Sequence, residues 1–412
     1  MSELASNTTH AAVPRSAFPW YLTSSSLWIA AMSLQGFLIS WMMVGTLQTS
    51  ADRVGFGRAL IELPGLLILL LGGVLADRTD ARRLLIGMHL TIALPSIAIA
   101  LMIRNDLLSF WVVVAFGVAV SALQAATDPA RQSILVRVTR TDIQRSVTIM
   151  TIVTSLAGLG GVWVGGRLDG IGLPVILLLQ AGCFAIGAGA ARRLPTLPPQ
   201  ARRDRVDLLA GIKAAWRIVL IRNVIGLNFL SSLANAGAYI VAIPFIVKQV
   251  YGGDAALFAT VIVVFTAGSI GSNVVLLRFM PLLRPGRLFL LMQLTRVIIL
   301  GVLWLSPARW LFYVVMFGWG FNMGVTSTLV QTTVQELAGS AHRAQILSVL
   351  LVSFMVSAPL SSMVLGSLIA RFDPLTALIP AIVISIVIFG VGVTSSGLWS
   401  YEPHVGTISR SR

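Results

Sequence analysis

Apolar runs separated by short polar connections follow one another along almost the whole chain from residue 20 onward. A helix that crosses a bilayer needs about 20 consecutive, mainly apolar residues. Twelve such runs are present, near residues 20–47, 56–76, 84–103, 108–130, 144–167, 172–191, 223–248, 256–277, 287–305, 309–335, 345–370 and 374–396. Because backbone polar groups inside lipid must be satisfied within the protein, the pattern predicts an all-α membrane protein with twelve transmembrane helices.

One connection, residues 192–222, is much longer than the others. It opens with a proline-rich stretch and continues into residues 208–218, where apolar and basic residues recur at helical spacing. We therefore predict two six-helix bundles, 1–191 and 223–412, joined by a cytoplasmic linker with an amphipathic helix on the membrane surface. A plain linker is the alternative. Weak internal symmetry links the halves, since Phe-Gly at 116–117 recurs at 317–318.

The composition excludes a water-soluble globular protein. Of 412 residues, 56% are hydrophobic and 11% are charged, and the mean hydropathy is +0.89. The net charge of +15 does not indicate a nucleic-acid partner, because the basic residues lie in the connections rather than on one surface. We assign 22 of the 30 Lys and Arg to the side of the termini and 7, Arg58 among them, to the opposite side. This bias predicts that both termini are cytoplasmic.

Sequence features of soluble enzymes are not found. The single cysteine, Cys183, lies in an apolar run, and the four histidines are scattered without metal-ligand spacing. The chain also has no Gly-x-x-x-x-Gly-Lys phosphate loop. We expect no metal, no cofactor and no enzymatic activity, so an ion or solute gradient must drive any transport.

A dense charge cluster occupies the connection between the second and third apolar runs. Residues 72–83 read Gly-Gly-Val-Leu-Ala-Asp-Arg-Thr-Asp-Ala-Arg-Arg. The glycine pair allows two helices to approach closely, and the three arginines favour the anionic headgroup layer. A second passage, residues 128–142, runs from Asp-Pro-Ala-Arg-Gln-Ser into a short basic stretch.

These two passages resemble the corresponding segments of major facilitator superfamily transporters, and particularly those of the enterobactin-exporter-like branch. The resemblance implies the major facilitator fold, a bacterial inner membrane, and alternating access about a cavity lined by the first, fourth, seventh and tenth spans. It also implies a cytoplasmic gate in which Asp77 pairs with an arginine, for which Arg131 is the candidate, beside Arg78, Arg82 and Arg83. The alternative is that these charges only set topology, since exposed ion pairs contribute little.

Glu62 is the most unusual residue within a span. It precedes Asp77 by 15 residues, or roughly 22 Å of helix, which places it past the midplane. A carboxyl at this depth is costly when charged, so a proton-coupling role is one hypothesis. Pairing with Arg58, one turn away, is the other. Arg296 also lies inside a span, where we expect a hydrogen-bonded, structural role.

The remaining polar residues on the expected cavity-lining spans are uncharged. These candidates are Gln35, Gln124, Asn228, Asn235 and Asn322. A cavity with neutral hydrogen-bonding groups among bulky apolar side chains suits an amphipathic or aromatic solute. Helix–helix packing is the alternative for each of them.

Together these features predict a secondary transporter that exports an amphipathic, siderophore-like or drug-like small molecule, with protons as a possible coupling ion. We expect a monomer whose partners are its solute and membrane lipid. Import of a small organic metabolite is the alternative, followed by a non-transporting membrane receptor or an intramembrane enzyme on the same fold.

Overall fold

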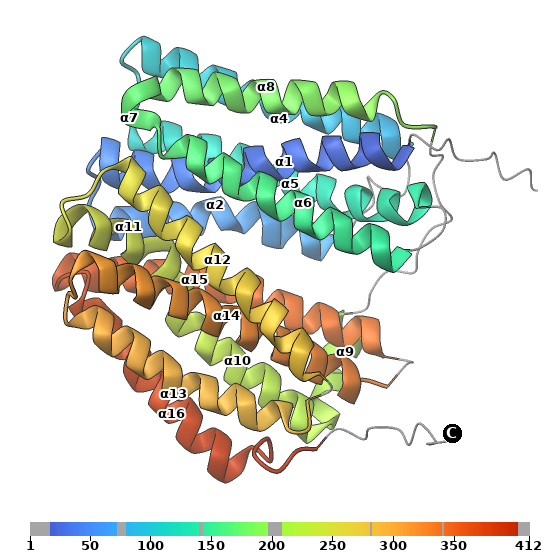
Figure 1. Cartoon of the computed structure of the whole chain (residues 1–412), viewed down its shortest axis with the longest axis vertical. Helices are drawn as coiled ribbons and strands as arrows, with labels where there is room; N and C mark the ends of the chain where they lie inside the picture. The colour runs from blue at the N-terminus through green and yellow to red at the C-terminus, as the bar shows by residue number, and fades with distance from the viewer. Residues whose placement is uncertain are drawn as a thin grey trace, which may run out of the picture.

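The computed structural model describes residues 17–71, 80–139, 143–196, 208–280, 282–339 and 342–402, which contain helices and no strand (Figure 1). The first half contains α1 (Ala17–Trp41) with its π-helical extension η1 (Met42–Thr46), α2 (Ala51–Leu71), α4 (Ala81–Arg104), α5 (Phe110–Val138), α6 (Ile143–Gly165), α7 (Leu168–Ile171) and α8 (Leu173–Ala191). The short helix α9 (Leu208–Arg217) follows.

The second half begins with a continuous helical stack: α10 (Val219–Gly237), η2 (Ala238–Ala242), α11 (Ile243–Phe245) and η3 (Ile246–Val250). It continues with α12 (Ala255–Phe279), α13 (Pro285–Trp304), α14 (Arg309–Leu337), α15 (Arg343–Arg371), η4 (Thr376–Leu378) and α16 (Ile379–Ser395). Side-chain caps start several of these helices; the carboxylate of Asp254, for example, accepts the backbone N–H of Leu257 at 2.8 Å.

Length and apolar composition make ten of the described helical segments able to cross a membrane. The long helices α2 and α14 pack among them, so each of the twelve predicted runs coincides with a helix or a helical stack. The chain is therefore an all-α membrane protein, as the hydropathy pattern predicts.

Many of the arginines assigned to connections lie within helices instead, and two of them, Arg58 and Arg131, are buried. The helix α2 begins at Ala51, and Arg58 is buried in it because its side chain faces the protein interior rather than lipid. The helix α5 continues to Val138, eight residues beyond the predicted span, and includes Arg131. Hydropathy marks where a helix leaves the apolar layer, whereas backbone hydrogen bonding decides where the helix ends.

The two halves meet along two helix pairs. Within the first half, α1 packs on α6 and α8, and α4 packs on α5 and α8; within the second, α12 packs on α14, α13 on α14 and α16, and α10 on α15. Between the halves, α2 packs on α15 and α6 packs on α12. Figure 1 shows the first half, blue to green, above the second half, yellow-green to red.

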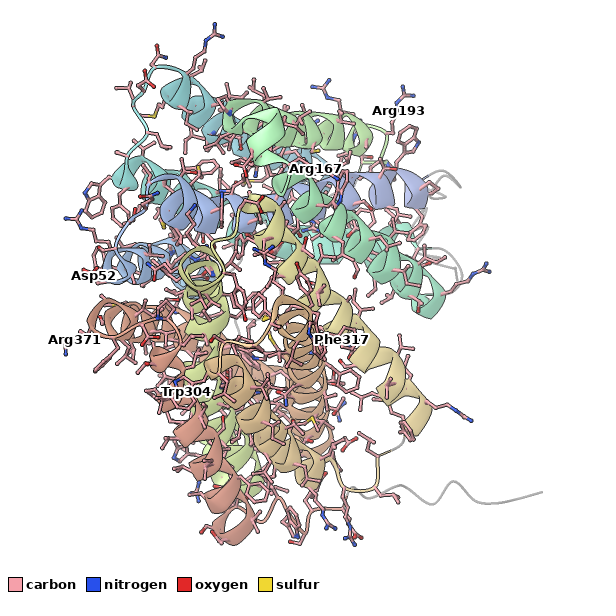
Figure 2. All side chains as sticks on the ribbon, turned by 60° about the vertical axis from the view of Figure 1, so that its left-hand side comes forward. Asp52, Arg167, Arg193, Trp304, Phe317 and Arg371 are labelled. Carbon is pink, nitrogen blue, oxygen red and sulfur yellow. The ribbon has the colours of Figure 1, made fainter. Side chains whose placement is uncertain are left out.

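We call the end at which α2 begins and α15 ends the outer end, because the charge bias predicts that it faces away from the cytoplasm. Here the backbones of α2 and α15 touch. A Cβ atom on Gly366 would overlap the carbonyl oxygen of Ala51 and would lie 2.9 Å from the Cα of Gly55. Figure 2 shows Asp52 and Arg371, which mark these two helix ends, on the same side of the molecule.

Among the described residues, the buried apolar core is continuous between the halves only toward the outer end. One cluster joins residues of both halves, including Val54 and Ile369. Toward the opposite end the core divides into one cluster from the first half, around Tyr21 and Leu85, and a separate cluster dominated by the second half, around Leu329. The described core is therefore shared by the two halves at the outer end and separate in each half at the other end.

Candidate functional site: a cavity between the two halves

A stack of aromatic rings closes the outer end between the halves. Phe258 of α12 stacks on Phe37 and Trp41 of α1, with ring centroids 5.1 and 5.5 Å apart. The ammonium of Lys248 lies 5.8 Å from the centroid of the Trp41 ring, within reach of a cation–π contact.

A cavity of about 370 Å³ extends inward from this stack. Its walls come from α1, α2, α6, η2, α11 and α12, so both halves contribute. Apolar groups dominate the lining, with polar side chains from Ser33, Ser40, Arg58, Thr154, Ser155, Tyr239 and Thr266. No described residue of α5 or α14 lines it, in contrast to the expectation for the fourth and tenth spans, because the cavity follows the α6–α12 side of the interface.

Arg58 is the charged residue among the described cavity-lining residues. It is 9% exposed, and its Nε atom is buried without a hydrogen-bond partner. The nearest carboxylate oxygen is Oε1 of Glu62, 4.0 Å from Nη2. Glu62 lies eleven residues into α2, about 16 Å along the helix from its start. The proximity to Arg58 that the pairing alternative assumes is present at 4.0 Å, whereas a proton-coupling role stays a prediction.

Only some of the five gate candidates lie within the described residues. Asp77 and Arg78 lie outside the described residues. Arg82 donates a hydrogen bond from Nη2 to the carbonyl oxygen of Arg192 at 2.6 Å, which joins the start of α4 to the end of α8. The backbone N–H of Arg83 donates to the carboxylate of Asp80, the N-cap of α4.

Arg131 has contacts within its own half. Its Nη1 lies 3.3 Å from Oδ1 of Asp128, one turn earlier in α5. Its guanidinium lies 5.4 Å from the centroid of the Trp28 ring, and its carbonyl oxygen accepts a hydrogen bond from the hydroxyl of Tyr21. These contacts hold α5 against α1; whether Arg131 also pairs with Asp77 stays a prediction.

Two of the cavity candidates belong to the first half. Gln35 is buried on the face of α1 that meets α8, where its Oε1 accepts a hydrogen bond from Nε2 of Gln180 at 2.5 Å. Gln124 is half-buried in α5. Neither lines the described cavity.

Of the other three candidates, all in the second half, Asn322 belongs to a buried polar cluster around Arg296. Asn322 accepts a hydrogen bond from Nη2 of Arg296 and donates to the carbonyl oxygen of Met292 and to Thr295. Arg296, 4% exposed, also donates to Ser231, so its guanidinium is held by neutral groups away from lipid.

Asn228 and Asn235 lie on the same helix as Ser231. The side-chain nitrogen of Asn228 and the side-chain oxygen of Asn235 are buried without partners among the described residues. Neither residue, nor Asn322, lines the cavity.

Sequence reasoning did not place Arg58 or Tyr239 among the cavity-lining residues. Arg58 was expected in an outer connection, and Tyr239 was not singled out at all. The available signal was the spacing of Arg58 and Glu62, which places both on one face of α2.

A helical membrane protein with a solute-sized cavity between two halves has the architecture of a secondary transporter. The chain belongs to the Major Facilitator Superfamily, whose family model matches residues 22–362. No curated protein matches the sequence significantly.

Solved structures share the fold at low sequence identity. The nucleoside transporter NupG is similar with a TM-score of 0.76 and 14% identity, over 94% of this chain and 100% of that one. A POT family transporter in complex with 5-aminolevulinic acid is similar with a TM-score of 0.72 and 13% identity, over 93% of this chain and 96% of that one. A bacterial homologue of the human lysosomal transporter Spinster, in an inward-facing conformation, is similar with a TM-score of 0.69 and 14% identity, over 94% of this chain and 98% of that one. These structures show a shared fold; the match to the superfamily model is what identifies the chain as a transporter rather than an enzyme.

Proposed function

We propose that this protein exports an amphipathic organic small molecule across the bacterial inner membrane by alternating access. The observation that carries the proposal is the cavity: both halves line it, most of its wall is apolar, and an aromatic stack seals its outer end. A solute bound in this cavity cannot leave toward the outer end until the halves separate along the helix pairs α2–α15 and α6–α12.

The moving units in this proposal are the six-helix bundles 1–191 and 223–412, joined by the linker 192–222. The division of the apolar core away from the outer end supports this, because two separate cores can shift as rigid bodies. The protein works as a monomer with cytoplasmic termini, surrounded by lipid. The two sequence passages that resemble the enterobactin-exporter-like branch support the outward direction and a siderophore-like or drug-like solute.

The cytoplasmic gate of this proposal consists of Asp77, Arg78, Arg82, Arg83 and Arg131. This gate closes when the bundles rock together at the cytoplasmic end. Of the polar candidates, Gln124 and Asn235 are half-buried and stay candidates for the open pathway. The hydrogen bonds of Gln35 and Asn322 support packing roles instead.

Proton coupling in this proposal runs through Glu62. A proton on its carboxyl removes the negative charge that faces Arg58, and its loss restores that charge, so the pair has two electrostatic states. A glutamine at the same position leaves the pair with one electrostatic state, because its amide carries no charge.

Uptake into everted inner-membrane vesicles tests the proposal, with a panel of neutral, anionic and cationic naphthalene derivatives as probes. Vesicles with the wild-type protein should accumulate at least one probe, and an imposed pH gradient should change the rate. Glu62→Gln should remove the response to the gradient but keep downhill exchange. No uptake of any probe contradicts the assignment of the cavity, whereas a full gradient response in the variant contradicts only the role of Glu62.

Import of a small organic metabolite is the second candidate. The proximity of Arg58 and Glu62 is the observation that favours import. If solute and proton bind together at this pair, the inward proton gradient drives both inward. The direction is tested by imposing pH gradients of both signs. A higher rate of probe transport when proton and solute move in the same direction supports import. A higher rate when they move in opposite directions supports export.

A further inference from the structure

Arg58 carries a charge that the protein itself compensates poorly. Its side chain is buried, and Nε has no hydrogen-bond partner in the described part of the chain. The 4.0 Å separation from Glu62 is too long for a hydrogen bond. The side chain of Glu62 is also 37% exposed, so its carboxylate is not enclosed together with the guanidinium. A buried cation without a well-bonded counter-ion is costly.

The surroundings of Arg58 offer no further anion. The cavity wall presents hydroxyl groups and aromatic rings, and no carboxylate comes from its described lining residues. Across the interface, Tyr239 of the second half lines the same cavity as Arg58 and packs its ring on Phe265, with centroids 4.4 Å apart. The cavity is therefore an apolar space with one positive group at the junction of the two halves.

We propose that Arg58 binds the anionic group of the transported solute, so that the substrate class is an amphipathic organic anion with a carboxylate or sulfonate head and an apolar or aromatic body. This rests on the proposed function of the cavity as the solute site. A guanidinium binds such heads with two parallel, charge-assisted hydrogen bonds. The volume of about 370 Å³ accommodates the body among Phe37, Phe258 and the aliphatic wall.

Glu62 then competes with the solute for Arg58. When its carboxyl is ionised, Glu62 neutralises part of the Arg58 charge and repels the incoming anion. When it is replaced by glutamine, both effects disappear. The negative charge of Glu62 therefore weakens anion binding, and its removal strengthens it.

Binding to the purified full-length protein in phosphatidylcholine nanodiscs tests this inference, because zwitterionic lipid does not itself attract anions. The probe is radiolabelled 2-naphthoate, measured by scintillation proximity. Its methyl ester and 2-naphthylmethylamine, with similar bodies and zero or positive charge, serve as competitors. Naphthoate should bind saturably, and both competitors should be about tenfold weaker or worse.

Three variants separate the roles. Arg58→Gln should weaken naphthoate binding by about tenfold or more and leave ester binding unchanged. Glu62→Gln should strengthen naphthoate binding, because it removes the negative charge beside Arg58. Arg53→Gln, an exposed arginine on the same helix, is the matched control and should behave as wild type. If Arg58→Gln does not fold, as judged by size exclusion, Arg58→Lys replaces it and should keep the preference for the anion with reduced affinity.

The inference is overturned if removing the Arg58 charge leaves naphthoate affinity unchanged, if Glu62→Gln weakens it, or if the amine binds best. Binding of the ester without binding of naphthoate would overturn the anion assignment and leave the cavity as a solute site. No binding of any of the three probes contradicts both.

Discussion

The backbone contact between α2 and α15 gives a direct way to open the outer end. At Gly366, an added Cβ atom would meet the backbone of α2 at Ala51 and Gly55, with no flexible side chain to move aside. We predict that Gly366→Ala forces these two helices apart and shifts the protein toward an outward-open arrangement.

The size of the shift follows from the cost of overpacking, about 1–3 kcal/mol for one extra methyl group in a packed interface. Because this cost applies only to the outer-closed state, the ratio of outer-open to outer-closed molecules should rise by about 5-fold to 150-fold. Gly65→Ala is the matched control on the same helix pair. Its Cβ atom would lie 3.4 Å from the flexible end of Met355, an ordinary contact.

The assay is a distance distribution between two spin labels in nanodiscs, one at Arg104 and one at Arg371, with Cys183 replaced by serine. Both labelled residues are exposed near the outer end, on different halves. Gly366→Ala should add or enlarge a population at longer distance, and Gly65→Ala should match the parent. The reasoning is refuted if Gly366→Ala folds normally and its distribution equals that of the parent.

Three further predictions address the gate, the buried polar cluster and the topology. Asp77→Asn should sharply reduce transport while the protein stays folded in the membrane, and near-normal transport would leave Asp77 with a topological role only. Asn322→Ala should lower the free energy of unfolding by about 1–3 kcal/mol, because it leaves the Nη2 group of Arg296 without its acceptor; an unchanged thermal midpoint in detergent would contradict this. A cysteine at position 200 should be protected from an impermeant maleimide in intact cells and one at position 53 should react, and the reverse pattern would overturn the orientation.

The linear pattern of apolar residues was enough to predict the helices. Each predicted run coincides with a helix because a segment in lipid must satisfy its own backbone, whatever its neighbours are. Helix ends were less well predicted: α5 continues past residue 130 to Val138, where hydrogen bonding rather than hydropathy sets the limit. The spacing of Arg58 and Glu62 also anticipated their proximity, since four residues on a helix return to the same face.

Which side chains reach the cavity was decided only by the tertiary structure. Gln35 and Asn322 are as polar in the sequence as any lining residue, yet each bonds to a neighbouring helix within its own half. Arg58 looked like a connection residue because its charge interrupts the apolar run, whereas the interface with the second half shelters it from lipid. The sequence by itself determined the helices, because their hydrogen bonds are local. The cavity depends on how helices distant in sequence rotate and pack, and no local pattern specifies those contacts.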